Sequence, residues 1–410
     1  MTEPKLLHIR LGPSAEGQVR SGHPWVYDKS IREQSRPGTA GEIAIIFDSK
    51  NRFLAAGLYD PHSPIRVRVL HCGKPLAIDP LFLAARLKES FEHRRELLDA
   101  RTNGLRLVHG ENDGLPGLVV DRYASTLVIK LYTSIWLVWL PGLVQTLISS
   151  EPSPDRIVLR LSRNVQDLLK DQPTYHDGKI LHGSIPAQSV VFQESGLHFE
   201  ADVLRGQKTG FFLDQRENRQ YVETISAGSD VLNTFSFSGG FSLYAARGGA
   251  RSVTDLDISA HALEGARRNF DLNTGDKSIS SVRHERVQAN TFDWLAQTDR
   301  RFGLIVLDPP SMAKREIERA RAIEAYQHLT TLALKRLRPN GILVAASCSA
   351  HVTAEEFFDA VRSACSQGKS PMQELRVSRH PKDHPTTFQQ AAYLKCIVMR
   401  SGTQTRNPTI

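Results

Sequence analysis

Two stretches, Gly303-Leu-Ile-Val-Leu-Asp308-Pro309-Pro310 and Gly341-Ile-Leu-Val-Ala-Ala-Ser347-Cys348-Ser349, decide the fold of this chain. Each is a short apolar run that begins at a glycine and ends in polar residues, which is typical of a strand buried in a parallel sheet. In such sheets ligands bind in the crevice at the carboxyl ends of the strands. A carboxylate after one strand and a thiol after the other therefore predict chemistry at that edge.

The composition is that of a globular protein with an excess of basic side chains. A chain of 410 residues is long enough for two or three domains, and 40% hydrophobic with 23% charged residues is ordinary. The formal net charge of +8 favours a polyanionic partner such as nucleic acid, although many mildly basic proteins bind none. The four cysteines show no CxxC spacing, which argues against a disulfide framework or a metal site and fits a reducing cytoplasm.

The chain shows no pattern of secretion or membrane insertion. The first five residues lack a basic region followed by an apolar one, so no signal peptide is predicted. The most apolar window, residues 126–148, is interrupted by Lys130, Pro141 and Gln145, which favours a strand, a turn and a helix over a membrane span. We therefore expect a cytoplasmic protein without a membrane partner.

Apolar spacing and turn residues predict three folded regions and a tail. Short strands separated by turns predict a small β-barrel, and strands around helices at residues 79–100 and 136–149 predict an α+β domain. From Val231 strands alternate with helices, including 260–272 and 315–337, which predicts a doubly wound, Rossmann-like α/β domain. The expected bounds are 1–75 for the barrel, 76–195 for the α+β domain, 196–400 for the α/β domain and 401–410 for a disordered tail.

A turn of small residues follows the first predicted strand of the α/β domain, in Val231-Leu-Asn233-Thr-Phe235-Ser-Phe-Ser238-Gly239-Gly240. Gly239 and Gly240 let the backbone approach a ligand closely, and the helix start offers free amide donors. We expect a nucleoside-containing cofactor to bind at Asn233, Phe235, Ser238, Gly239 and Gly240. Tight packing of the strand on the helix is the alternative reason for the two glycines.

The second predicted strand ends in acid, at Asp255 and Asp257. A carboxylate at this position can accept both hydrogen bonds of a ribose diol. Asp257 is preferred to Asp255 because it closes the strand. The GxGxxG pattern that wraps a pyrophosphate is absent, which disfavours NAD. S-adenosylmethionine has ribose and adenine but no phosphate, so it suits this looser turn better.

A polar segment precedes the first of these strands, in Gly206-Gln-Lys208-Thr209-Gly-Phe-Phe212-Leu-Asp214-Gln-Arg216. One interpretation is a capped amphipathic helix that follows a turn. The other is a lid over the cofactor or the substrate base. As a lid it would present Phe212, Asp214 and Arg216 to the cofactor and Lys208 and Thr209 to the substrate.

Cys348 and Asp308 are the expected catalytic pair. Carbon 5 of cytosine is a poor nucleophile, but addition of a thiolate to carbon 6 makes the ring enamine-like and reactive toward a methyl sulfonium. A carboxylic acid such as Asp308 assists by holding a proton at ring atom N3. Asp308 also lies where the cofactor is expected, and Pro309 and Pro310 would give the base a stiff surface. A buried structural cysteine is the competing interpretation.

Asp-Pro-Pro followed by an aromatic residue also occurs in enzymes that methylate exocyclic amino groups. Here Ser311 and Met312 follow instead, and amino methylation needs no nucleophilic cysteine. The sequence therefore favours methylation of carbon.

Several stretches together resemble those of the cytosine-C5 methyltransferases of large-subunit ribosomal RNA. The resemblance spans nearly the whole chain, in Gly22-His-Pro-Trp25-Val-Tyr27, Glu111-Asn-Asp-Gly-Leu-Pro-Gly-Leu-Val-Val-Asp121-Arg-Tyr, Gln207-Lys-Thr-Gly-Phe-Phe-Leu-Asp-Gln-Arg216, Asn233-Thr-Phe-Ser-Phe-Ser-Gly-Gly240, Asp308-Pro-Pro and Ser347-Cys-Ser. It implies a PUA domain, a central α+β domain and a class I methyltransferase domain that uses S-adenosylmethionine.

The resemblance implies methylation of carbon 5 of a cytosine in 23S ribosomal RNA, with Cys348 as nucleophile. It also implies RNA contact by the barrel, where Trp25 and Tyr27 could stack on bases, although aromatic residues at that spacing are more often barrel core. Asn290 stands where such enzymes carry an acid beside adenine, and its amide can still hydrogen-bond that ring. Ser311 replaces the second cysteine found in many of these enzymes.

Three other interpretations stay open. The enzyme could methylate a guanine ring nitrogen or an adenine amino group, or the chain could be an RNA-binding assembly factor without activity. An NAD-dependent enzyme is disfavoured by the missing glycine pattern. The sequence does not decide whether the protein forms a homodimer.

Overall fold

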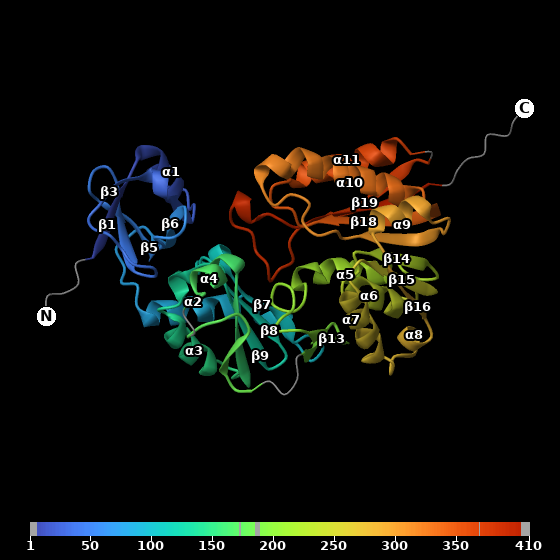
Figure 1. The fold of residues 1–410 in the computed structure, drawn as a ribbon, viewed down its shortest axis with the longest axis horizontal. Coiled ribbons are helices and arrows are strands. Elements are labelled where there is room, and N and C mark those ends of the chain that lie inside the picture. Colours follow the sequence, from blue (N-terminus) through green and yellow to red (C-terminus); the bar gives the residue numbers. More distant parts are fainter. Residues whose placement is uncertain (1–5, 172–173, 185–188, 369, 403–410) are drawn as a thin grey trace, which may run out of the picture. The chain divides into compact units, whose positions relative to one another are not determined.

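The computed structural model describes residues 6–171, 174–184, 189–368 and 370–402, and the chain divides into two compact units (Figure 1). Unit 1 comprises residues 1–193 and 201–211, and unit 2 comprises residues 194–200 and 212–410. The expected domain boundaries at residues 75, 195 and 400 stay a prediction. Residues 403–410 of the expected tail lie outside the described residues.

The N-terminal part of unit 1 is a six-stranded sheet in the order β2-β6-β5-β4-β1-β3. Buried side chains alternate along β1 and β4, and Leu7, Ile9, Ile46 and Val67 form a buried core with Val19 of the helix α1. The elements are β1 (Leu7–Leu11), α1 (Pro13–Arg20), β2 (Trp25–Tyr27), β3 (Ile31–Gln34), β4 (Ile43–Phe47), β5 (Phe53–Tyr59) and β6 (Ile65–Cys72).

The second part of unit 1 is a five-stranded sheet in the order β11-β10-β9-β8-β7 with three helices. Asp79 caps the helix α2 by accepting from the Phe82 amide at 2.8 Å, but α2 ends at Glu92, short of the predicted residue 100. The elements are α2 (Pro80–Glu92), β7 (Gly104–His109), β8 (Leu118–Tyr123), β9 (Thr126–Leu131), α3 (Leu140–Ile148), β10 (Arg156–Leu161), α4 (Arg163–Leu168) and β11 (Lys179–His182).

The helix predicted for residues 136–149 is shorter than expected. A 3₁₀ turn, Ser134–Trp136, precedes α3, which starts at Leu140 because the fixed φ of Pro141 suits the first helical turn. The boundary between the units passes through the hairpin of β12 (Val190–Glu194) and β13 (Leu197–Ala201).

Unit 2 is built on a seven-stranded sheet in the order β16-β15-β14-β17-β18-β20-β19. The five strands from β16 to β18 pair in parallel, and β20 runs antiparallel between β18 and β19. Its elements are α5 (Arg216–Thr224), β14 (Asp230–Thr234), α6 (Gly240–Arg247), β15 (Ser252–Asp257), α7 (Ala260–Asp271), α8 (Lys277–Ser280), β16 (Arg283–Gln288), α9 (Thr291–Gln297), β17 (Phe302–Leu307), α10 (Arg319–Leu334), β18 (Leu337–Ser347), α11 (Ala354–Ser366), β19 (Met372–Ser378) and β20 (Lys395–Ser401).

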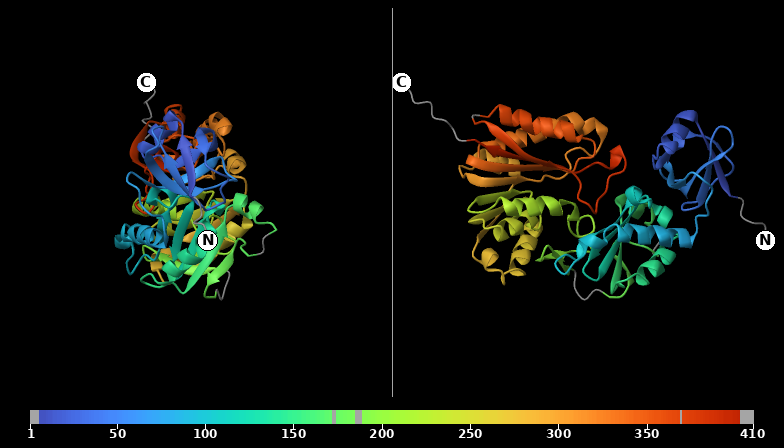
Figure 2. Two further views of the ribbon diagram at one scale, coloured as in Figure 1. Left: turned by 90° about the vertical axis from the view of Figure 1, so that its left-hand side faces the viewer. Right: turned by 180° about the vertical axis from the view of Figure 1, so that it is seen from behind.

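Helices cover both faces of this sheet, as expected for a doubly wound fold. Helices α5 and α6 lie together on one face, and α10 and α11 lie together on the other, an arrangement also seen from behind (Figures 1 and 2). The predicted fold class is therefore confirmed. The helix predicted for residues 260–272 matches α7, but the one predicted for 315–337 is wrong at its ends, because α10 spans Arg319–Leu334 and β18 begins at Leu337.

Within the described ranges, none of the helices combines the length and apolar character needed to cross a membrane. The same residues contain no cluster of three or more His, Cys, Asp or Glu side chains arranged to hold a metal ion.

Candidate active site

The turn between β14 and α6 places small polar residues at the carboxyl edge of the sheet of unit 2. Gly239 caps α6 with a φ of 74°. A Cβ at this position would lie 2.9 Å from the Cβ of Ala266 and 3.1 Å from Oδ2 of Asp255. Glycine is therefore required both by the left-handed backbone and by the close approach of the helix α7.

Two aromatic residues of this turn carry backbone strain. Phe235 and Phe237 have φ angles of 53° and 48°, a region that costs about 1–3 kcal/mol for a bulky residue and that persists mainly at functional sites. The amide of Phe237 donates to Oδ2 of Asp257 at 2.9 Å, and the amide of Ser259 donates to Oδ1 at 2.8 Å. Asp257 thus connects the turn to the end of β15 by hydrogen bonds. The rings of Phe237 and Phe212 pack edge-to-face, with their centroids 5.0 Å apart.

Three oxygens around the turn are arranged to take hydrogen bonds from a ligand. Oδ1 of Asn233 and the hydroxyls of Ser236 and Ser238 are buried and have no partner within the described part of the chain. A buried polar atom left without a partner costs about 1–3 kcal/mol. A donor-rich ligand such as S-adenosylmethionine, with its ammonium, ribose hydroxyls and adenine amino group, would satisfy them. These residues therefore fit that cofactor.

The two candidate ribose acids are placed differently. Asp255 is fully buried and accepts hydrogen bonds from Asn233, Ser242 and His284, at 3.0, 2.6 and 2.8 Å. Asp257 is only half-buried at the strand end, which supports the choice of Asp257 for the ribose.

Asn290 is exposed and caps the helix α9. Its Oδ1 accepts from the amides of Phe292 and Asp293 at 2.9 and 3.3 Å. Its amide nitrogen, rather than its oxygen, is left to face adenine.

The polar segment at the start of α5 is a structural hub rather than an exposed lid. The guanidinium of Arg216 is buried and donates to both carboxylate oxygens of Asp383, at 2.8 and 3.1 Å. Asp214 is buried and accepts from the hydroxyl of Tyr393 at 2.9 Å. Arg219 forms a buried bidentate pair with Glu194. The charged residues for which the sequence left a helix and a lid open thus form buried ion pairs, and the pair of Arg216 with Asp383 holds the C-terminal segment in place.

A chain of hydrogen bonds runs from this hub to Asp308. Ser378 donates to Asn218 at 2.7 Å, Asn218 donates to Gln215 at 2.6 Å, and Gln215 donates to Oδ1 of Asp308 at 2.8 Å. Gln215 and Asn218 are buried, so the orientation of the half-buried Asp308 carboxyl is fixed from behind. Sequence reasoning gave no role to Gln215, Asn218 or Ser378, because Gln215 lies 93 positions from Asp308 and Asn218 lies 160 positions from Ser378.

Cys348 stands between two anchored serines at the end of β18. Ser347 and Ser349 are fully buried, whereas Cys348 is half-buried and its Sγ lies 3.9 Å from the carbonyl oxygen of Pro309. The hydroxyl of Ser347 donates to the Tyr326 hydroxyl at 2.8 Å, and the hydroxyls of Ser349 and Tyr326 lie 2.7 Å apart.

Ser349 also joins the two loops that carry the expected catalytic pair. Its Oγ accepts from the amides of Met312 and Ala313 at 3.0 and 3.3 Å and from the Ser311 hydroxyl at 3.2 Å. The loop after Asp308 is therefore tied to the loop that presents Cys348. Ser349, to which the sequence analysis gave no role, therefore joins the loops that carry Asp308 and Cys348.

A buried lysine at the start of β20 lies beside the loop that carries Cys348. Lys395 is 1% exposed, and its ammonium donates to the carbonyl oxygens of Ser349 and Val352. Burial lowers the pKa of Lys395 to about 8, while the negative charge of a Cys348 thiolate raises it. A cation next to a cysteine favours the thiolate. Sequence reasoning missed Lys395, although a lysine opening the apolar run of β20 was a usable signal.

Comparison with known proteins identifies the family. A model of S-adenosylmethionine-dependent methyltransferases matches residues 138–400. The chain belongs to this methyltransferase family. A ribosomal RNA large subunit methyltransferase of Deinococcus radiodurans is 52% identical over 402 residues, which cover 96% of this methyltransferase and 97% of that protein. Ribosomal RNA large subunit methyltransferase I of Shewanella denitrificans is 34% identical, with 96% and 99% of the two chains covered.

Solved structures share the fold of the methyltransferase. A protein from Streptococcus mutans, described as a methyltransferase dependent on S-adenosylmethionine, superposes with a TM-score of 0.80 at 21% identity, covering 96% of this chain and 99% of that one. A second solved methyltransferase, complexed with S-adenosylhomocysteine, has a TM-score of 0.81 at the same identity and coverage.

A PUA-like model matches residues 9–71 of the methyltransferase, the part of unit 1 that contains the six-stranded sheet. There the indole of the half-buried Trp25 donates to Glu111 at 2.9 Å, and Tyr27 is 37% exposed beside it. Val26, rather than either aromatic residue, enters the buried core of this sheet. This differs from the barrel-core interpretation and leaves the ring of Tyr27 accessible.

The remaining residues expected to contact RNA differ in how accessible they are. Thr209 is 1% exposed and donates to Asp121 at 2.6 Å, so it can act on RNA only through its neighbours. The carbonyl of Lys208, at a φ of 53°, accepts from Lys130 at 2.9 Å. Pro309 is buried and Pro310 is exposed, which makes Pro310 the accessible face of the Asp308 loop.

Proposed function

We propose that this methyltransferase transfers a methyl group to carbon 5 of a cytosine in large-subunit ribosomal RNA through a covalent adduct with Cys348. The observation that carries the proposal is the half-buried thiol of Cys348 beside the Asp308 loop, held there by Ser349, with Lys395 beside the loop that carries it. The printed names of the relatives from Deinococcus and Shewanella support the substrate class.

Cys348 supplies the nucleophile. Its thiolate forms a carbon–sulfur bond to carbon 6 of the cytosine, and the electron pair of the 5,6 double bond moves to carbon 5. Carbon 5 then takes the methyl group and still carries its proton. A base takes that proton, the electron pair of the carbon–hydrogen bond restores the double bond, and the carbon–sulfur bond breaks to return the thiolate. The positive charge of Lys395 stabilises the thiolate at the beginning and at the end of this cycle.

Asp308 holds a proton at N3 of the ring while carbon 6 is attacked. The hydrogen bond from Gln215 fixes one carboxyl oxygen, so the group is oriented before the substrate arrives. A target base must leave its helix or stack to reach such a site. Exposed Pro310 offers a flat, stiff surface for that base.

S-adenosylmethionine supplies a methyl group on a positively charged sulfur. We assign its binding to Asn233, Phe235, Ser238, Gly239 and Gly240, with Asp257 on the ribose and Asn290 at the adenine. We also assign Phe212, whose ring packs on Phe237 of the turn, and Asp308 to the cofactor. The buried Asp214 and Arg216 act on it through the C-terminal segment that they hold.

RNA contact is assigned to the six-stranded sheet and to the polar segment of unit 1. Tyr27, with Trp25 beside it, can stack on a base, and Lys208 can contact phosphate. We propose residues 1–75, 76–195 and 196–400 as the three functional domains.

Methylation of an exocyclic amino group or a guanine ring nitrogen is the competing function, and it needs no thiol. The test is incubation of unmodified large-subunit ribosomal RNA with S-adenosylmethionine carrying a labelled methyl group, followed by mass spectrometry of the nucleosides. We expect labelled 5-methylcytidine from the wild type and from Cys72→Ser, whose exposed cysteine lies in unit 1, and none from Cys348→Ser. Any other methylated nucleoside, or full activity of Cys348→Ser, would contradict the proposal.

A further inference from the structure

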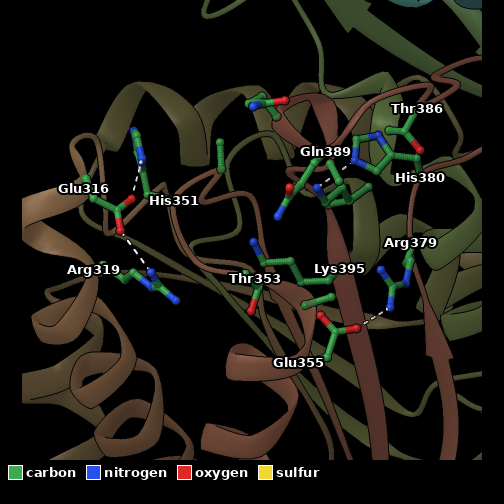
Figure 3. Close-up of a pocket in the computed structure, with 15 residues that line it drawn as sticks. Glu316, Arg319, His351, Thr353, Glu355, Arg379, His380, Thr386, Gln389 and Lys395 are labelled. Atoms are coloured by element: carbon green, nitrogen blue, oxygen red, sulfur yellow. Dashed lines mark hydrogen bonds and ion pairs between the residues drawn. The ribbon is translucent and has the colours of Figure 1, made fainter. Parts of the chain in front are cut away.

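A cavity of about 400 Å³ opens in unit 2 close to Cys348, and the proposed chemistry does not use it. Its volume lies in the range of about 300–1,000 Å³ that is usual for ligand sites. Its lining residues come from three segments of unit 2 (Figure 3): Glu316 and Arg319, then residues 350–355, and then residues 379–395.

The cavity is connected to the nucleophile by two residues. Ala350, two positions after Cys348, lies in its lining, and so does Lys395, which donates to the carbonyl oxygen of Ser349. The nucleotides next to a target base stay joined to it by a single phosphodiester. An RNA chain that places its cytosine on Cys348 therefore brings a neighbouring nucleotide to this cavity.

The walls are fixed before any ligand binds. Nε2 of His380 accepts from the amides of Tyr393 and Leu394 at 3.0 and 2.9 Å. These two bonds hold the ring of His380 against the backbone of residues 393 and 394. The pairing of Arg216 with Asp383 and of Asp214 with Tyr393 anchors the same segment to α5. A preformed cavity loses little entropy on binding, which suits a recognition site.

Both guanidinium groups of the cavity are paired with carboxylates, and the ammonium of Lys395 is buried and donates to backbone carbonyls, which argues against a phosphate site. Arg319 is paired with Glu316 at 3.0 Å, and Arg379 is paired with Glu355 at 2.8 Å (Figure 3). His351 also faces Glu316. Guanidinium groups already neutralised by carboxylates have little attraction left for an anion.

Between these walls lie side-chain amides that make no hydrogen bond among the described residues. The side chains of Gln389 and Gln390 and the hydroxyl of Thr386 are exposed and make no hydrogen bond among the described residues. Figure 3 shows Gln389 directed into the cavity, between the wall with Glu316 and His351 and the wall with Arg379 and His380. An amide presents one donor and one acceptor group side by side, which is the pattern that reads the edge of a base.

We propose that this cavity binds the base of a nucleotide adjoining the methylated cytosine, and that Gln389 reads its edge. The inference rests on the proposed function and extends it to sequence context. Glu316, Arg319, Glu355 and Arg379 shape the cavity, and Lys395 connects it to the cysteine loop.

The test uses transcripts of large-subunit ribosomal RNA in which each neighbour of the methylated cytosine, once that cytosine has been located, is changed to all four bases. For the wild type we expect kcat/KM to vary about tenfold with the base at one of the two positions, as for one well-made base contact. Gln389→Ala should reduce this preference to less than about twofold, whereas Gln373→Ala, an exposed glutamine on β19, should keep it. Gln389→Glu replaces the donor by an acceptor and should shift the preference toward a base that presents an amino group.

Equal rates of the wild type on all neighbouring bases would overturn the proposal. A Gln389→Ala variant that keeps the base preference would also overturn it. An equal loss of activity on every RNA would do the same, because it would indicate a contact with the RNA backbone rather than with a base. Failure of the proposed function is distinguishable, because the product would then not be 5-methylcytidine on any of these RNAs.

Discussion

Ser349→Ala should destabilise the methyltransferase domain and impair catalysis at the same time. The serine is fully buried, and its Oγ accepts from two backbone amides, Met312 and Ala313, while bonding the hydroxyls of Ser311 and Tyr326. Alanine leaves both amides without this acceptor, and each unsatisfied buried donor costs about 1–3 kcal/mol. We expect a loss of about 3 kcal/mol in the free energy of unfolding, or about 6–12 °C in Tm for a domain of this size.

The assay is denaturant unfolding together with methyl transfer. The Tyr326 hydroxyl keeps its bond to Ser347, so the variant should fold, but the Asp308 loop loses its tie to Cys348 and kcat should fall at least tenfold. Ser366→Ala is the matched control, because this serine is exposed on the last turn of α11 and should change stability by less than about 0.5 kcal/mol. Equal stability of Ser349→Ala and Ser366→Ala would refute the role given to this hydroxyl.

Three further variants test other parts of the site. Gly239→Ala places a Cβ where φ is 74° and should weaken S-adenosylmethionine binding at least tenfold by calorimetry, and unchanged affinity would contradict the assigned turn. Asp383→Asn breaks the buried pair with Arg216 and should cost about 3–5 kcal/mol of unfolding free energy. Burial opposes the negative charge of Asp383, but His384 and Arg216 hold the pKa of its carboxyl below the usual range. The stabilisation from the ion pair with Arg216 is therefore present above pH ~4 and is lost as pH falls. Lys395, with a pKa lowered to about 8, is charged below that pH, so kcat should decline above pH 8 in the wild type and show no such decline in Lys395→Met.

Local patterns in the sequence predicted the elements that meet at the sheet edge. Glycine-bounded apolar runs gave β17 and β18, and the small-residue turn before Gly240 gave the start of α6, because these features depend on neighbouring residues. Helix ends were less predictable. Only Lys335 and Arg336 separate the end of α10 at Leu334 from the start of β18 at Leu337, and Leu337 continues the helical spacing of the apolar residues.

Contacts between distant residues could not be predicted in this way. Arg216 and Asp383 are separated by 167 positions and Gln215 and Asp308 by 93, and no periodicity links residues so far apart. The sequence therefore left a capped helix and a lid as alternatives for the segment before α5 and did not show that Arg216 and Arg219 are buried in ion pairs. A lysine that opens the apolar run of β20 could have been noticed in the sequence, but its position near Cys348 arises only from the pairing of β20 with β18.

The most direct test of the proposed mechanism is covalent trapping on large-subunit ribosomal RNA that contains 5-fluorocytidine in place of cytidine. Fluorine at carbon 5 cannot leave as a proton, so the carbon–sulfur bond should persist after methyl transfer. We predict a stable protein–RNA adduct whose nuclease and protease digestion yields the modified peptide of Cys348, formed by the wild type and by Cys72→Ser but not by Cys348→Ser. Absence of an adduct from the wild type on RNA that it methylates when unfluorinated, or an adduct on a different residue, would contradict the mechanism.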